Sequence, residues 1–144
     1  MSKYATGKLI GWVFGLALLV TAFPAAAQEE KPLKEIMQGM LADMEKIVAG
    51  IMREDYPLIA TTAEGIAYHG NPPPAARMKM ARELRLDAMA FKLFDDAVRR
   101  YASELQEAAL AADRNGVVEA YGNTVKACTA CHASYRERIR HMKN

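Results

Sequence analysis

Apolar residues recur at alternating intervals of four and three positions over residues 32–52. Six of them form one line along a helix: Leu33, Met37, Met40, Met44, Ile47 and Ile51. Because positions three and four apart share a helix face, this spacing predicts an amphipathic helix rather than a strand. Ile36, Leu41 and Val48 widen the apolar line into a face broad enough to be buried.

The next apolar segment follows a short polar turn and has clear signals at both ends. Asp55 is suited to cap a helix, and Pro57 suits its first turn. The segment stops near Gly70, because the prolines that follow in Asn71-Pro72-Pro73-Pro74 forbid a continuing helix. His69, at the end of this predicted helix, is expected on the surface.

The remainder of the chain contains one longer connection and two further helices. Residues 75–88 show no clear period and predict a crossover connection that can include a short helical turn. Helical spacing returns from Phe91 to Ala112 and again from Val118 to Ile139, with a turn over residues 113–116 between them. Four amphipathic helices without strands predict an all-α fold, an antiparallel four-helix bundle that holds cofactors between facing helices.

The first 27 residues have the pattern of a secretory signal peptide. Lys3 and Lys8 precede an apolar run over residues 9–23, and Ala25-Ala26-Ala27 fits a cleavage site before Gln28. The alternative is a retained membrane anchor, for which the run is short against the roughly 20 residues that span a bilayer. The sequence therefore predicts a signal peptide (1–27), a mature domain (28–144) and a periplasmic location.

Composition and charge are ordinary for a globular protein and exclude some functions. The 144 residues are 51% hydrophobic and 25% charged. Without Lys3 and Lys8, the 19 basic residues become 17 and equal the 17 acidic ones, so no strong field for nucleic acid is expected. The densest basic cluster, Arg136, Arg138, Arg140 and Lys143, is interpreted as complementing a helix dipole, with docking of a redox partner as the alternative.

The only two cysteines belong to the motif Cys128-Thr129-Ala130-Cys131-His132. The spacing C-x-x-C-H is that of a c-type haem attachment site. On a helix both thiols lie on one face, where they can reach the two vinyl groups of one porphyrin, and the adjacent imidazole can bind the iron. A disulfide would leave the histidine unexplained, a thioredoxin-like pair needs βαβ surroundings, and zinc usually needs four ligands.

With this motif near the end of the last helix, the chain resembles the class II cytochromes c, namely the cytochrome c prime family and its methionine-ligated low-spin relatives. The resemblance implies one haem c per chain, with thioethers from Cys128 and Cys131 and His132 as the proximal iron ligand. It also implies that Tyr135 and Arg136 belong to the haem surroundings. An arginine that many members carry on the first helix is absent before Arg53.

Three methionines are candidates for the distal iron ligand. The haem near the C-terminal end of the last helix should face the first half of the first helix, where Met37, Met40 and Met44 point inward. Met37 is favoured, because the Ile36-Met37 pair looks like the ligand position of the low-spin relatives. The alternative is that these flexible side chains only fill an irregular core.

These expectations lead to three functional hypotheses. The first is a one-electron carrier with redox partner proteins in the periplasm, since methionine–histidine ligation is typical of electron-transfer haem. The second is a five-coordinate haem that binds NO or CO, and the third is a helical interaction module without haem. No enzyme activity, nucleic-acid partner or membrane contact beyond the signal segment is expected, and a homodimer remains open.

Overall fold

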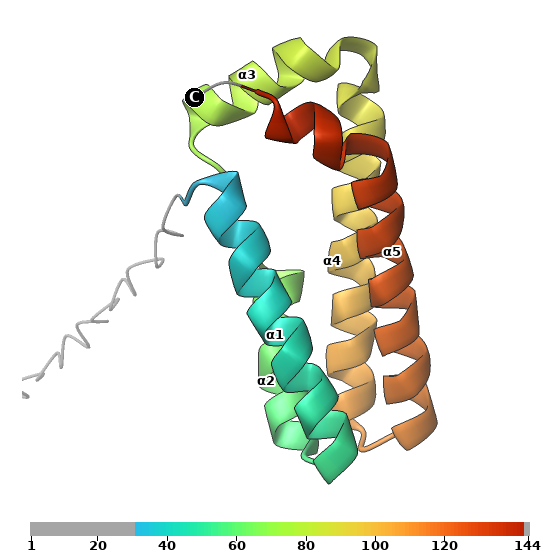
Figure 1. Ribbon diagram of the computed structural model, residues 1–144. Helices are drawn as coiled ribbons and strands as arrows, with labels where there is room; N and C mark the ends of the chain where they lie inside the picture. The colour runs from blue at the N-terminus through green and yellow to red at the C-terminus, as the bar shows by residue number, and fades with distance from the viewer. Residues whose placement is uncertain (1–30, 143–144) are drawn as a thin grey trace, which may run out of the picture.

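Helices make up nearly all of the computed structural model, which describes residues 31–142 (Figure 1). Within that range no strand occurs. The predicted all-α fold is confirmed, and the predicted signal peptide lies outside the described residues. The helices are α1 (Leu33–Arg53), α2 (Tyr56–Ala67), α3 (Pro74–Leu84), a 3-10 turn (Arg85–Asp87), α4 (Ala88–Leu110) and α5 (Arg114–Arg140).

The four principal helices form an antiparallel bundle, as predicted. α1 packs on α2, α2 on α4, and α4 on α5, while α3 lies across one end (Figure 1). The backbones of α1 and α5 stay apart for most of their length, and a cavity opens between them at the end that α3 covers. The bundle is therefore closely packed on three sides and held open on the fourth.

The turn between α1 and α2 is set by two adjacent acidic residues. Glu54 adopts the left-handed conformation (φ 55°), which ends α1 while the Asp55 amide donates to the Gly50 carbonyl at 2.9 Å. The Asp55 carboxylate then caps α2 by accepting a hydrogen bond from the Leu58 amide at 3.1 Å. The capping role predicted for Asp55 is confirmed.

Two predicted connections are more helical than expected. The crossover over residues 75–88 contains the 11-residue helix α3, which begins with Pro74 in its first turn and continues as a 3-10 turn into α4. The turn expected over residues 113–116 is already the start of α5, because Asp113 accepts from the amides of Asn115 and Gly116, both at 3.1 Å. The first prediction was wrong because α3 has only a weak apolar period, and tertiary contacts decide its conformation.

The hydrophobic core fills the half of the bundle away from α3. Its fully buried large side chains include Ile47, Ile59, Ile66, Leu105 and Val117. The one fully buried polar side chain among the described residues, Thr124, donates its hydroxyl to the Ala120 carbonyl at 2.9 Å and so stays satisfied.

Gly50 allows α1 and α2 to approach closely just before their connecting turn. A Cβ atom added at Gly50 would lie 2.7 Å from Cγ1 of Ile59, which is fully buried and cannot move aside. By contrast, a Cβ atom at Gly122 in α5 would meet no atom within 4 Å. Substitution of Gly50 by alanine therefore tests the close packing of the helices, whereas substitution of Gly122 tests only the backbone entropy of glycine.

We predict that Gly50→Ala lowers the free energy of unfolding by about 1–3 kcal/mol through overpacking. Gly122→Ala is the control and should raise it by up to about 1 kcal/mol, because alanine is the better helix former. Urea unfolding followed by far-UV circular dichroism measures both. Equal effects of the two substitutions would contradict the close contact between α1 and α2.

Candidate cofactor site

A cavity of about 880 Å³ lies between α1, α4 and α5 under the cover of α3. Its volume lies in the range of sites for drug-sized ligands and cofactors. Most of its wall is apolar, and its charged side chains apart from Asp95 are cations: Lys34, Lys79, Arg136 and Arg140. The cavity thus suits a large apolar group that also carries negative charge.

The α5 wall carries the cysteine and histidine residues of the attachment motif. Cys128, Cys131 and His132 all line the cavity, and the two thiols are half-buried and unlinked. Burial raises the pKa of Cys128, and it raises the pKa of Cys131 to about 11, with the negative charge of Asp95 adding to the effect. Both sulfurs are therefore neutral thiols that face the same space from one helix.

Tyr135 and Arg136, expected in the haem surroundings, also line the cavity. Tyr135 is buried and packs edge-on against Phe91 and Phe94 of α4, with ring centroids 5.5 and 5.7 Å apart. Arg136 is exposed at the cavity margin. The tyrosine therefore fixes the separation of α4 and α5, while the arginine adds positive charge at the edge.

The α1 wall carries the three methionines expected there. Met37, Met40 and Met44 are partly buried and line the same cavity as His132. The first half of α1 thus faces the second half of α5 across the cavity. The structure brings these residues together and does not single out one of the three sulfurs.

Two further lining residues escaped sequence reasoning. Met80 is buried and reaches the cavity from α3, in the stretch that we expected to be irregular. Asp95 lines the cavity from α4. A signal for Asp95 was present, since it lies four residues after Phe91 and three before Val98, on the apolar face of its helix.

Asp95 is held by a cationic and an imidazole partner. Its Oδ2 accepts a hydrogen bond from Nε of Arg99 at 2.8 Å, and its Oδ1 lies 3.2 Å from Nε2 of His69, close but poorly aligned. Burial alone would raise the pKa of Asp95, but the contacts with His69 and Arg99 outweigh it and lower the pKa to about 2. Asp95 is therefore ionised at neutral pH.

The expectation that His69 lies on the surface was wrong. Its side chain is only 8% exposed, because the end of α2 turns it toward α4. Nδ1 of His69 lies 3.1 Å from Nη2 of Arg99 and 2.9 Å from the Gly70 carbonyl. A guanidinium only donates and a carbonyl only accepts. Nδ1 would therefore have to accept from Arg99 but donate to the Gly70 carbonyl, and it can do only one of these at a time. When Nδ1 accepts from Arg99, the ring proton is on Nε2 and faces Asp95.

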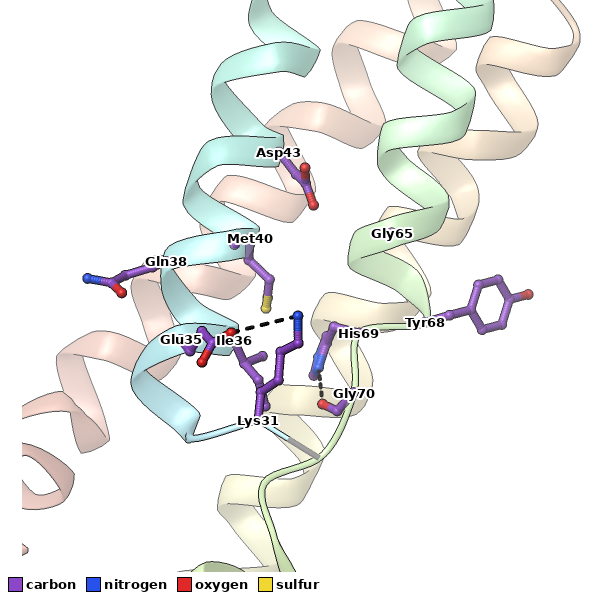
Figure 2. Close-up of a pocket in the computed structure, with 11 residues that line it drawn as sticks. Lys31, Glu35, Ile36, Gln38, Met40, Asp43, Gly65, Tyr68, His69 and Gly70 are labelled. Atoms are coloured by element: carbon purple, nitrogen blue, oxygen red, sulfur yellow. Dashed lines mark hydrogen bonds and ion pairs between the residues drawn. The ribbon is translucent and has the colours of Figure 1, made fainter. Parts of the chain in front are cut away.

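His69 also borders a second, more open hollow of about 640 Å³ between α1 and the end of α2 (Figure 2). Met40 and His69 extend toward it, whereas Tyr68 points away from it (Figure 2). The hollow is lined by charges of both signs, including Lys31, Glu35 and Asp43. The histidine therefore lies between this hollow and the wall of the large cavity.

The residues present fit a covalently attached haem. Two neutral thiols and an imidazole stand on one wall, thioethers stand on the opposite wall, and cations at the edge suit carboxylate groups. The sequence matches the model of the family Cytochrome C' over residues 25–136, which includes the attachment motif. The chain belongs to the cytochrome c′ family. It is therefore a haem-binding c-type cytochrome, and the family implies a covalently bound haem c.

Two other comparisons found no match, neither among curated proteins nor among solved structures. Among the described helices, none is long and apolar enough to cross a membrane. Within residues 31–142, no group of three or more His, Cys, Asp or Glu side chains could hold a metal ion on its own. Members of the cytochrome c′ family are typically periplasmic.

We predict that Asp95 stabilises this cytochrome c′ family member above about pH 4 and that the effect fades as the pH falls toward about 2. The folded-state pKa, about 2, lies below the ordinary value of 3.8, so the folded protein binds the proton less readily than the unfolded chain. The contribution at neutral pH is at most about 2 kcal/mol.

Urea unfolding at several pH values between 2 and 7 tests this contribution. Asp95→Asn should lower stability at pH 6 and approach the wild type near pH 2. Asp96→Asn is the matched control, because the Asp96 carboxylate is exposed and pairs with Lys92 at 2.6 Å on the same helix. A pH-independent difference between Asp95→Asn and the wild type would contradict the ionisation of Asp95 in the fold.

Proposed function

We propose that this protein is a methionine-ligated member of its family and acts as a periplasmic one-electron carrier. The observation that carries the proposal is the placement of three methionines of α1 on the cavity wall opposite His132. When bound, the haem supplies reversible exchange of a single electron. Side chains of the protein would attach the haem, ligate its iron and shield it from solvent.

Attachment and proximal ligation are assigned to the α5 wall. The thiols of Cys128 and Cys131 would form the two thioethers, and His132 would bind the iron through its imidazole. The three residues lie within one and a half turns of a continuous helix, which limits their relative movement. Tyr135, one turn further along α5, packs edge-on against two aromatic rings of α4 and so anchors this wall.

Distal ligation is assigned to a thioether of α1, with Met37 favoured over Met40 and Met44. Sulfur ligation from methionine raises the reduction potential, because a thioether stabilises ferrous iron. It also fills the position that a gas molecule would take. The apolar wall around these sulfurs excludes water, which suits a carrier that changes charge without changing structure.

Export and partner choice belong to the same proposal. The signal segment would be cleaved before Gln28, and the mature domain would exchange electrons with periplasmic redox proteins rather than transform a substrate. Cations at the cavity edge, among them Lys34 and Arg140, suit partners with acidic surfaces. A homodimer is compatible with this function.

Covalent attachment is tested by intact mass and acidic acetone extraction after periplasmic expression. We expect the mass of residues 28–144 plus one haem, with no haem released into acetone. Cys131→Ala should retain at most one thioether and mature poorly, because only one sulfur remains for the porphyrin. Thr129→Ala is the control, since it keeps the motif spacing; a loss of haem there, or a haem-free wild type, would refute the assignment.

Distal ligation is tested by optical spectra of the ferric protein and by CO binding to the ferrous protein. We expect a mainly low-spin wild type with a methionine–iron charge-transfer band and slow CO binding. Met37→Ala should become high spin and bind CO quickly, because it opens the sixth position. Met52→Ala is the control, since Met52 is on the same helix but is 76% exposed.

Two other results have defined meanings. If Met40→Ala or Met44→Ala removes the low-spin spectrum while Met37→Ala keeps it, electron transfer stands and the ligand lies one or two turns further along α1. A wild type that is already high spin and binds NO or CO would overturn the carrier and favour the gas-binding alternative.

A further inference from the structure

Asp95 is a charged residue of the cavity wall that neither attachment nor ligation uses. It is the only acidic side chain among the described residues that line the cavity. Its side chain is 30% exposed, and partial burial penalises its charge unless other groups compensate for it. Two groups do so, because Arg99 donates to one carboxylate oxygen and His69 lies beside the other.

This cluster is anchored to the fold on both sides. Arg99 donates to the Ala67 carbonyl at the end of α2 at 3.3 Å, so it ties α2 to α4. The anchoring explains why Arg99 lies here, but it does not need a carboxylate on the cavity wall. The Asp95 carboxylate, unlike Arg99 and His69, lines the cavity itself.

We propose that Asp95, held by Arg99 and His69, is an electrostatic determinant of the reduction potential of the haem in this cavity. The inference rests on the proposed one-electron function. Ferric haem carries one more positive charge than ferrous haem, so a fixed negative charge nearby stabilises the ferric form and lowers the potential. The positive charge of the Arg99 guanidinium partly offsets the effect of Asp95, so the net shift in the reduction potential depends on both charges.

The proposal predicts shifts of opposite sign for the two partners. Asp95→Asn removes the negative charge and leaves the Arg99 cation, so the potential should rise. Arg99→Gln leaves the carboxylate without its nearest cation, so the potential should fall. In each case we expect a roughly three- to tenfold change in the ratio of oxidised to reduced protein at a fixed ambient potential.

The experiment is a spectroelectrochemical titration of the purified holoproteins at pH 7 and constant ionic strength. Asp96→Asn is the matched control, since it makes the same charge change one residue away on the exposed face of α4, and its potential should stay near that of the wild type. The optical spectrum of each variant checks that its axial ligands are unchanged. Asp95 and Arg99 are both partly exposed, so neither substitution leaves a large void.

Opposite shifts for Asp95→Asn and Arg99→Gln, with no shift for Asp96→Asn, support the proposal. Shifts of the same sign, or equal shifts for Asp95→Asn and Asp96→Asn, would overturn it, because a merely structural role moves both partners alike. Failure of this proposal can be told apart from failure of the carrier assignment: a high-spin, CO-binding wild type defeats the carrier, whereas the potentials of the variants report the field of Asp95.

Discussion

The cavity between α1 and α5 is the constraint on which the rest of the structure depends. Helices that pack directly lie about 8–10 Å apart, and no side chain present fills the wider space that these two helices leave. The apolar half of the bundle below the cavity keeps the helices in place, and α3 closes the end. Since voids destabilise a fold in proportion to their volume, the polypeptide and its haem are expected to depend on each other for stability.

Each wall of the cavity has its own chemistry. α5 presents thiols and an imidazole, α1 presents thioethers, and α4 presents a carboxylate. Neighbouring side chains hold these wall residues, Tyr135 through two aromatic rings of α4 and Asp95 through Arg99 and His69. Such support by neighbouring side chains keeps a site in one geometry while its charge changes.

The sequence was sufficient to predict features that depend on residues close together in the chain. The period of α1, the cap at Asp55 and the C-x-x-C-H spacing each depend on residues within a few turns, and these predictions gave the bundle and the family. The inward placement of Met37, Met40 and Met44 followed from the same period.

Sequence reasoning failed where contacts join distant segments. α3 has too weak an apolar period to be recognised from the sequence, although its residues Met80 and Leu84 are buried in the structure. His69 is buried only because Asp95 and Arg99, on another helix, meet it at the end of α2. A polar residue on an apolar face, such as Asp95, suggests an inward position but does not identify its partners.

The order of packing along the chain has a consequence for folding. The extensive contacts of the principal helices join chain neighbours, α1 with α2, α2 with α4, and α4 with α5, which favours rapid local folding. Besides shared core packing, the turn after α1 is linked to the start of α5 by the exposed ion pair of Glu54 and Arg114, which contributes little to stability. A haem bonded to α5 and in contact with α1 would therefore link the first and last helices of the domain directly. Its loss would leave α1 held mainly by its packing against α2, up to the turn at Glu54.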